Sequence, residues 1–163
     1  MSIMNVPEAA PSRVKGIVRY LLQARGKREK REILEAVLSP TNLISKGDDK
    51  TLSRSMVKLT IRESIKTGLL EENDDKTEIT LSPRLNLKEE ILLPLVLSKL
   101  LLSESECPEN HDFARVLAWY LSQDFADAPG NWQETEQCLR EQVGDELLGF
   151  NDVRYGQFED WSC

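Results

Sequence analysis

Apolar residues recur at helical spacing in the first part of the chain. In residues 13–24 they stand three and four positions apart, which predicts an amphipathic helix with Ser12 as its N-cap and an end at Gly26. A second, shorter helix is predicted to begin at about residues 27–30 and to end at Pro40. Each helix has one apolar face, so the two are expected to share a core.

A third helix and a hairpin are predicted to follow. A polar segment, residues 41–49, is expected to be a connecting loop, and residues 50–66 then have helical periodicity that ends at Gly68. Two short apolar stretches, residues 69–70 and 77–81, flank a polar tip rich in Asn and Asp. This pattern predicts a β-hairpin.

Three helices and a hairpin in this order resemble the winged helix-turn-helix family over residues 12–83. The most specific fragment is IRESIKTGLL at residues 61–70, which is similar to the end of a recognition helix, its terminating glycine and the entry into the wing. Residues 79–83, ITLSP, resemble the strand that leaves the wing. The resemblance implies a DNA-binding module whose third helix enters the major groove.

The second half of the chain is predicted to be all helical. Residues 87–102 are apolar nearly all round, so this helix should be covered by protein on more than one side, with Pro94 in its first turn or at a kink. Helices are also predicted at about residues 112–125 and 135–148. We therefore expect a mainly α fold with a small β-hairpin: an N-terminal winged helix-turn-helix followed by an all-helical segment, residues 87–163. The apolar helix should join the two.

Charge divides the chain in the same place. Residues 1–87 hold 16 Lys and Arg and 12 Asp and Glu, whereas residues 88–163 hold 5 and 16, so the net charges are +4 and −11. Residues 1–66 alone have a net charge of +7. The asymmetry favours a first half that faces nucleic acid and a second half that repels phosphate, with two solvated faces of different sign as the alternative.

The third predicted helix has a basic face between two apolar stripes. The stripes are Val57, Ile61 and Ile65 on one side and Leu52, Met56 and Leu59 on the other. Arg and Lys on the face between them would reach guanine edges or phosphates, and cations near the helix start would add to an anion site; a solvated face is the alternative. Charge reversal of a single cation on this face is expected to weaken binding and to leave the fold intact. The candidate nucleic-acid-binding residues of this helix are Lys50, Thr51, Arg54, Ser55, Lys58, Arg62 and Lys66.

A second basic cluster lies between the first two predicted helices. Its members are Arg25, Lys27, Arg28, Lys30 and Arg31, of which Arg28 and Lys30 are candidate contacts to the sugar-phosphate backbone. The alternative is that Glu29, Glu32 and Glu35 pair with the cluster.

The predicted wing is acidic. Its residues Glu71, Glu72, Asp74, Asp75 and Glu78 outnumber Lys76, and DNA would repel them. Either the module binds double-stranded DNA through its helix alone, or the wing faces protein.

Nothing in the sequence indicates an enzyme. His111 is the only histidine, the three cysteines do not have metal-ligand spacing, and no nucleotide-binding or nucleophile motif is present. We expect no catalytic residues, no metal site, no cofactor and no small-molecule substrate. The longest apolar run, residues 91–97, is too short for a membrane span, and the unpaired cysteines fit reduced thiols. A cytoplasmic protein without a membrane partner is therefore predicted.

The chain as a whole also resembles a more particular family. Its opening MSIMNVP, the winged-helix pattern, the acidic helical segment and an aromatic-rich end are similar to the N-terminal part of DpdG-type accessory proteins of bacterial DNA-modification and phage-restriction clusters. An aromatic-rich end is unusual for a terminus and suggests a longer parent protein. The resemblance implies a DNA-binding accessory component that assembles with other protein subunits; the alternative is a protein-interaction winged helix that acts as an assembly module without direct DNA contact.

Overall fold

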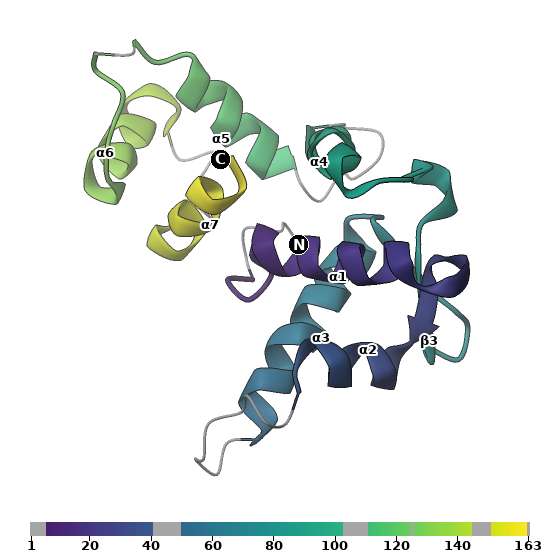
Figure 1. Cartoon of the computed structure of the whole chain (residues 1–163). Helices are drawn as coiled ribbons and strands as arrows, with labels where there is room; N and C mark the ends of the chain where they lie inside the picture. The colour runs from purple at the N-terminus through teal and green to yellow at the C-terminus, as the bar shows by residue number, and fades with distance from the viewer. Residues whose placement is uncertain (1–5, 41–49, 103–110, 125, 145–150, 163) are drawn as a thin grey trace.

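A computed structural model describes residues 6–40, 50–102, 111–124, 126–144 and 151–162, with the backbone alone at residues 50–53 and 111–112. Over these residues the chain is mainly helical with one small antiparallel sheet, which confirms the predicted fold class (Figure 1). In chain order the elements are α1 (Pro11–Gln23), η2 (Arg25–Lys27), β1 (Arg28–Lys30), α2 (Arg31–Leu38), α3 (Lys50–Lys66), β2 (Leu70–Glu72), β3 (Glu78–Leu81), η4 (Pro83–Leu85), η5 (Glu90–Leu92), α4 (Leu93–Leu102), α5 (His111–Leu121), α6 (Trp132–Gln142) and α7 (Asp152–Ser162).

The first two helices differ from their predicted starts. Helix α1 begins at Pro11 with Ala10 as its N-cap, because proline lacks the N–H that a first helical residue would leave unbonded. Helix α2 begins only at Arg31, so the start predicted at residues 27–30 is wrong. The backbone turns at Gly26, whose φ is +72°, and then extends as strand β1.

The predicted hairpin is present, and a third strand joins it. Strands β2 and β3 are antiparallel, and β1 pairs with the other side of β3, which gives the order β1-β3-β2. The side chain of Asn73 closes the hairpin turn by accepting hydrogen bonds from the backbone N–H groups of Thr77 and Glu78. The sequence did not predict β1, because Arg-Glu-Lys has no alternation of apolar and polar residues.

Two clusters of buried apolar side chains hold the molecule together. The first cluster comprises Val14, Ile17, Val18, Leu21, Leu34, Ile61, Leu69, Leu70, Ile79, Leu81, Leu87, Leu93 and Leu100. The second comprises Leu101, Phe113, Val116 and Phe158. Helix α4 contributes to both clusters and Trp161 packs against both, so α4 joins the two parts as the sequence predicted.

The second half departs from prediction at several points. Helix α5 ends at Leu121, and Phe125 lies outside the described residues, as do residues 145–148 of the predicted third helix there. Helix α6 starts at Trp132, where Asn131 caps it by accepting from the N–H of Glu134. Helix α7 lies within the segment predicted to be helical, but no separate helix was predicted at residues 152–162. Among the described residues, no helix is long and apolar enough to cross a membrane.

Candidate nucleic-acid interface

Helix α3 has the bounds that the sequence predicted, and its packing fixes which side faces outward. Ile61 is fully buried in the first cluster, and Val57 and Ile65 pack against it. The helix packs on α1, α2 and β2, and its N-terminal end projects away from the rest of the chain (Figure 1). Gly68, with φ +77°, turns the chain from the helix towards β2.

Four cations follow one another at four-residue spacing along α3. Arg54, Lys58, Arg62 and Lys66 are all exposed, and a spacing of four places them on one side of the helix. We call these four residues the α3 stripe. Ser55 is half-buried, and Lys50 and Thr51 lie in the first turn of α3 with side chains outside the described residues.

A buried carboxylate lies beside the C-terminal half of the stripe. The side chain of Glu63 is only 1% exposed, and its Oε1 accepts from Arg62 Nε at 3.2 Å and from Lys66 Nζ at 2.8 Å. A carboxylate removed from water needs such partners, because desolvation penalises its charge. The sequence pattern indicates the cations of the basic face but not the buried carboxylate that Arg62 and Lys66 balance. The i,i+3 spacing of Glu63 and Lys66 was the available signal.

The N-terminal half of the stripe is less constrained. Lys58 Nζ lies 3.8 Å from Glu35 Oε2 of helix α2, which is a long contact for an ion pair. Arg54 forms no ion pair with any other residue that the structure describes. The charge most available to a ligand is therefore at Arg54 and Lys58.

Two of the five cations in the second basic cluster pair with the wing. Arg28 pairs with Glu78 at 3.5 Å, and Arg31 pairs with Glu72 and also donates to the backbone oxygen of Lys76. Lys27 Nζ donates to the backbone oxygen of Leu87, and among the described residues no ion pair joins the cluster to Glu29, Glu32 or Glu35. Lys30 is exposed on β1.

The same pairs change the charge of the wing. Arg28 and Arg31 offset two of its five acids, and Glu71 accepts a hydrogen bond from Ser82 Oγ at 2.7 Å. Asp74 and Asp75 remain exposed at the tip. The repulsion that the sequence predicted for the whole wing is thus concentrated at its tip.

Within the part of the chain that the structure describes, no group of three or more His, Cys, Asp or Glu side chains is placed to hold a metal ion. The side chain of His111 is outside that part.

The fold and this surface define a mainly helical protein with a small antiparallel sheet and a row of cations on one helix. A model of the family described as DpdG-like matches residues 1–163, so the chain belongs to the DpdG-like family. Membership associates it with DNA-modification clusters, as an accessory protein. Comparisons with curated proteins and with solved structures find no match.

Proposed function

We propose that residues 12–83 form a winged helix-turn-helix in which α3 is the recognition helix and β2 and β3 form the wing. The order α1-β1-α2-α3-β2-β3 and the sheet order β1-β3-β2 support this assignment. In such a module one face of the third helix packs on the core, and the opposite face enters the major groove. The buried Ile61 and the exposed α3 stripe fit that requirement.

The proposed function is binding of double-stranded DNA as a non-enzymatic accessory component of a bacterial DNA-modification, restriction or phage-defence assembly. The α3 stripe is the observation that carries it, since four cations in line on a protruding helix match a phosphate backbone or guanine edges. Lys30 on β1 would add a contact to phosphate. The acidic segment, residues 87–163, would face other subunits of the assembly in the cytoplasm.

Fluorescence anisotropy of a labelled DNA duplex at about 50 and 200 mM salt tests the proposal, because each phosphate contact adds about −0.9 to the slope of log affinity against log salt. Arg54→Glu and Lys58→Glu should weaken binding and reduce the slope. Lys99→Glu, the same charge change at an exposed position of α4, is the matched control and should bind as the parent does. If all three variants bind like the parent, α3 is not the recognition helix.

The alternative is a winged helix that assembles with protein and does not contact DNA. It is favoured by the acids that already pair with three cations of the α3 stripe and by the exposed Asp74 and Asp75. Absence of duplex binding at the lower salt concentration would support this alternative.

A further inference from the structure

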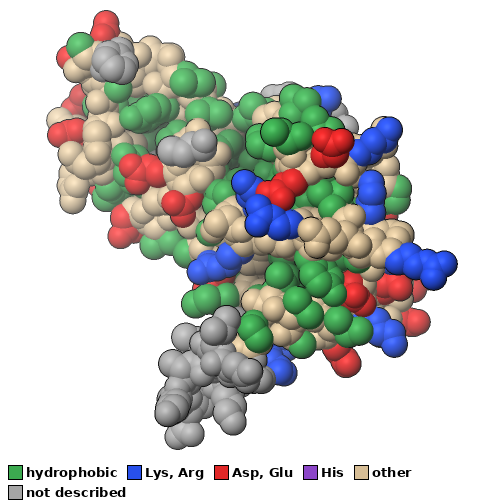
Figure 2. All heavy atoms as spheres, viewed as in Figure 1, with side chains coloured by type: hydrophobic (Ala, Val, Ile, Leu, Met, Phe, Trp, Pro, Cys, Tyr) green, Lys and Arg blue, Asp and Glu red, His purple; other side chains and the backbone are tan. Residues whose placement is uncertain are grey.

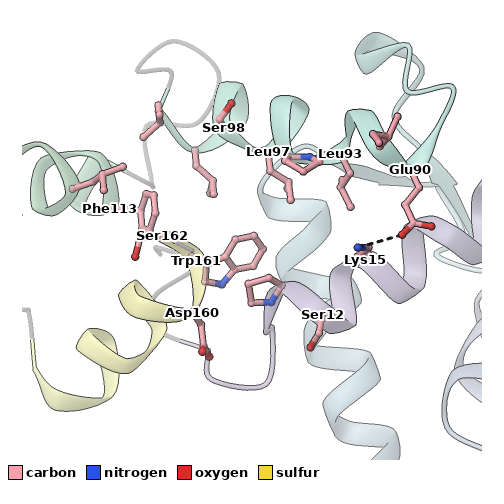
Figure 3. Close-up of a pocket in the computed structure, with 16 residues that line it drawn as sticks. Ser12, Lys15, Glu90, Leu93, Leu97, Ser98, Phe113, Asp160, Trp161 and Ser162 are labelled. Atoms are coloured by element: carbon pink, nitrogen blue, oxygen red, sulfur yellow. Dashed lines mark ion pairs between the residues drawn. The ribbon is translucent and has the colours of Figure 1, made fainter. Parts of the chain in front are cut away.

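A groove of about 820 Å³ lies between α1, α4, α5 and α7 (Figure 3). This volume is within the range of sites that bury a ligand. The side chains that line it are mainly apolar, and Leu97, Phe113 and Trp161 come from three different helices. Its apolar lining includes Leu93, Leu97, Leu101, Phe113, Leu117 and Trp161.

Apolar side chains also stand exposed at the edge of this groove. Ile91 and Leu102 line it and are 81% and 46% exposed, and Leu92 and Leu95 of the same segment are 41% and 56% exposed. Figure 2 shows hydrophobic side chains gathered over the region of α4. Apolar patches of this kind usually mark protein interaction sites. A small molecule that filled the groove would leave this edge in water, so the edge favours a protein.

Charge selects among possible partners. Residues 88–163 have a net charge of −11, and Asp160 lines the groove, while Glu90 at its other end is bound to Lys15 and Arg19. A second copy of this chain that docked through the same groove would bring the negative charge of its own residues 88–163, and anionic lipid headgroups or DNA would also be repelled. A segment with Lys and Arg beside its apolar side chains is complementary.

The groove walls also favour one secondary structure for the bound partner segment. They are helices, whose backbone N–H and C=O groups are bonded within each helix except at its ends, so the walls offer partners to another backbone only at the ends of α1, α4 and α7. Even the hydroxyl of Ser98 in the wall already donates to the oxygen of Leu95. An extended peptide would bury unpaired backbone groups there, whereas an α-helix satisfies its own.

We infer that this groove binds an amphipathic helix of a partner protein, with an apolar stripe at i, i+3 or i+4 and i+7 and with Lys or Arg beside that stripe. The inference rests on the assembly part of the proposed function and is independent of DNA binding. The partner's apolar side chains would enter between Leu97 and Trp161 and cover Ile91 and Leu102 at the edge.

Binding of a labelled synthetic peptide to the whole chain tests the inference. The probe is a Leu/Lys amphipathic helix of about 18 residues, long enough to be helical in isolation, and its controls are a scrambled peptide of equal composition and a Leu/Glu counterpart. The parent should bind the Leu/Lys helix and neither control. Ile91→Lys and Leu102→Lys should each weaken binding about tenfold or more, because they place a charge in an apolar contact. Leu121→Lys, at a position 74% exposed outside the groove, has the same charge change and should bind as the parent does.

Three results would overturn the inference. The first is equal binding of the ordered and scrambled peptides, and the second is unchanged peptide binding by both groove variants. The third is self-association of the parent in sedimentation that Ile91→Lys abolishes, which would assign the groove to a second copy of the chain. Duplex binding measured on the same variants separates this test from the proposed function. Loss of peptide binding with DNA binding retained identifies the groove, whereas loss of both together would show that it is not a separate site.

Discussion

Helix α3 buries several polar side chains, whereas helix α4 exposes several apolar ones. Helix α3 buries the polar residues Thr60, Glu63 and Ser64, each no more than 2% exposed. Helix α4 is much more apolar in sequence, yet it leaves Leu95 and Leu102 about half exposed. A buried polar group or an exposed apolar side chain is more informative than a buried apolar or an exposed polar one, because it is unusual and needs an explanation.

The two helices also differ in whether these side chains find partners within the chain. The Thr60 hydroxyl donates to the oxygen of Met56 at 2.8 Å, and Glu63 has two cations, so most of the polar cost in α3 is met within the chain. The apolar surface of α4 is covered on one side only by the described residues, although the sequence predicted cover on more than one side. Helix α3 therefore satisfies most of its buried polar groups within the chain, whereas α4 has an exposed apolar surface that fits the proposed partner helix.

The largest expected effect on stability comes from comparing the same substitution in the buried face of α3 and at the exposed edge of the groove. Ile61→Asp places an unpaired charge at a fully buried position, so the free energy of unfolding should fall by about 4 kcal/mol or more. Ile91→Asp, at a position 81% exposed, should change it by about 0.5 kcal/mol or less. Urea unfolding followed by circular dichroism measures both. Similar losses in the two variants would mean that the edge of the groove is part of the core.

The next effect concerns the buried carboxylate of α3. Lys66→Met removes one partner of Glu63 and should lower the free energy of unfolding by about 1 to 2 kcal/mol, reduced from the value for a fully buried pair because Lys66 is partly exposed. Lys58→Met breaks only the long contact with Glu35 and should cost about 0.5 kcal/mol or less. Equal losses of unfolding free energy in the two variants would show that burial of Glu63 does not depend on its ion pair with Lys66.

These pairs also refine the expectation that charge reversal anywhere on the stripe leaves the fold intact. At Arg62 or Lys66, reversal would place a carboxylate beside the buried Glu63, so a loss of DNA binding there would be mixed with a loss of stability. Arg54 and Lys58 are the positions at which binding can be tested separately.

The sequence predicted elements that local signals define. The bounds of α3 follow from its periodicity and from Gly68, and the hairpin follows from its polar tip. Strand β1 has no local signal, since its three polar residues become a strand only through pairing with β3. Helix α7 has no amphipathic pattern, although Tyr155 and Phe158 bury their side chains after folding. Its order comes from packing against residues distant in the sequence.

For the candidate site, sequence spacing placed the cations on one side of α3 but gave no information on their partners. Glu35 and Glu72 reach Lys58 and Arg31 from other elements, and such contacts depend on the tertiary fold. Apolar composition likewise indicated a helix at residues 87–102 without indicating the groove.

A smaller effect, dependent on pH, is expected at the contact between α1 and η5, the short helix that leads into α4. Glu90 accepts two hydrogen bonds from Arg19 of α1, both at 2.7 Å, and this contact lowers the pKa of the Glu90 carboxyl. A lowered pKa in the folded state gives stability that is present above the unfolded pKa of about 4.3 and is lost as pH falls through the folded value. Glu90→Gln should therefore have a lower melting temperature than the parent at neutral pH. This difference in melting temperature should disappear in acid. Thermal melts across pH measure the difference, with Glu89→Gln as the neighbouring control; a difference of constant size would show that the ion pair is not its source.

The smallest expected effect is at the tip of the wing. Arg28 and Arg31 offset Glu78 and Glu72, and Glu71 is half-buried and accepts from Ser82 Oγ, so the exposed charge that repels DNA is at Asp74 and Asp75. Asp74→Lys with Asp75→Lys should raise duplex affinity about threefold to tenfold at low salt if the tip lies near phosphate, and the gain should shrink as salt increases. The control, Asp127→Lys with Glu141→Lys, makes the same change in net charge in the acidic half, so it separates a local effect from a general one. An equal gain in both double variants would mean that only overall charge matters. No gain in the tip variant, with Arg54→Glu still weakening binding, would mean that α3 binds DNA while the wing faces elsewhere.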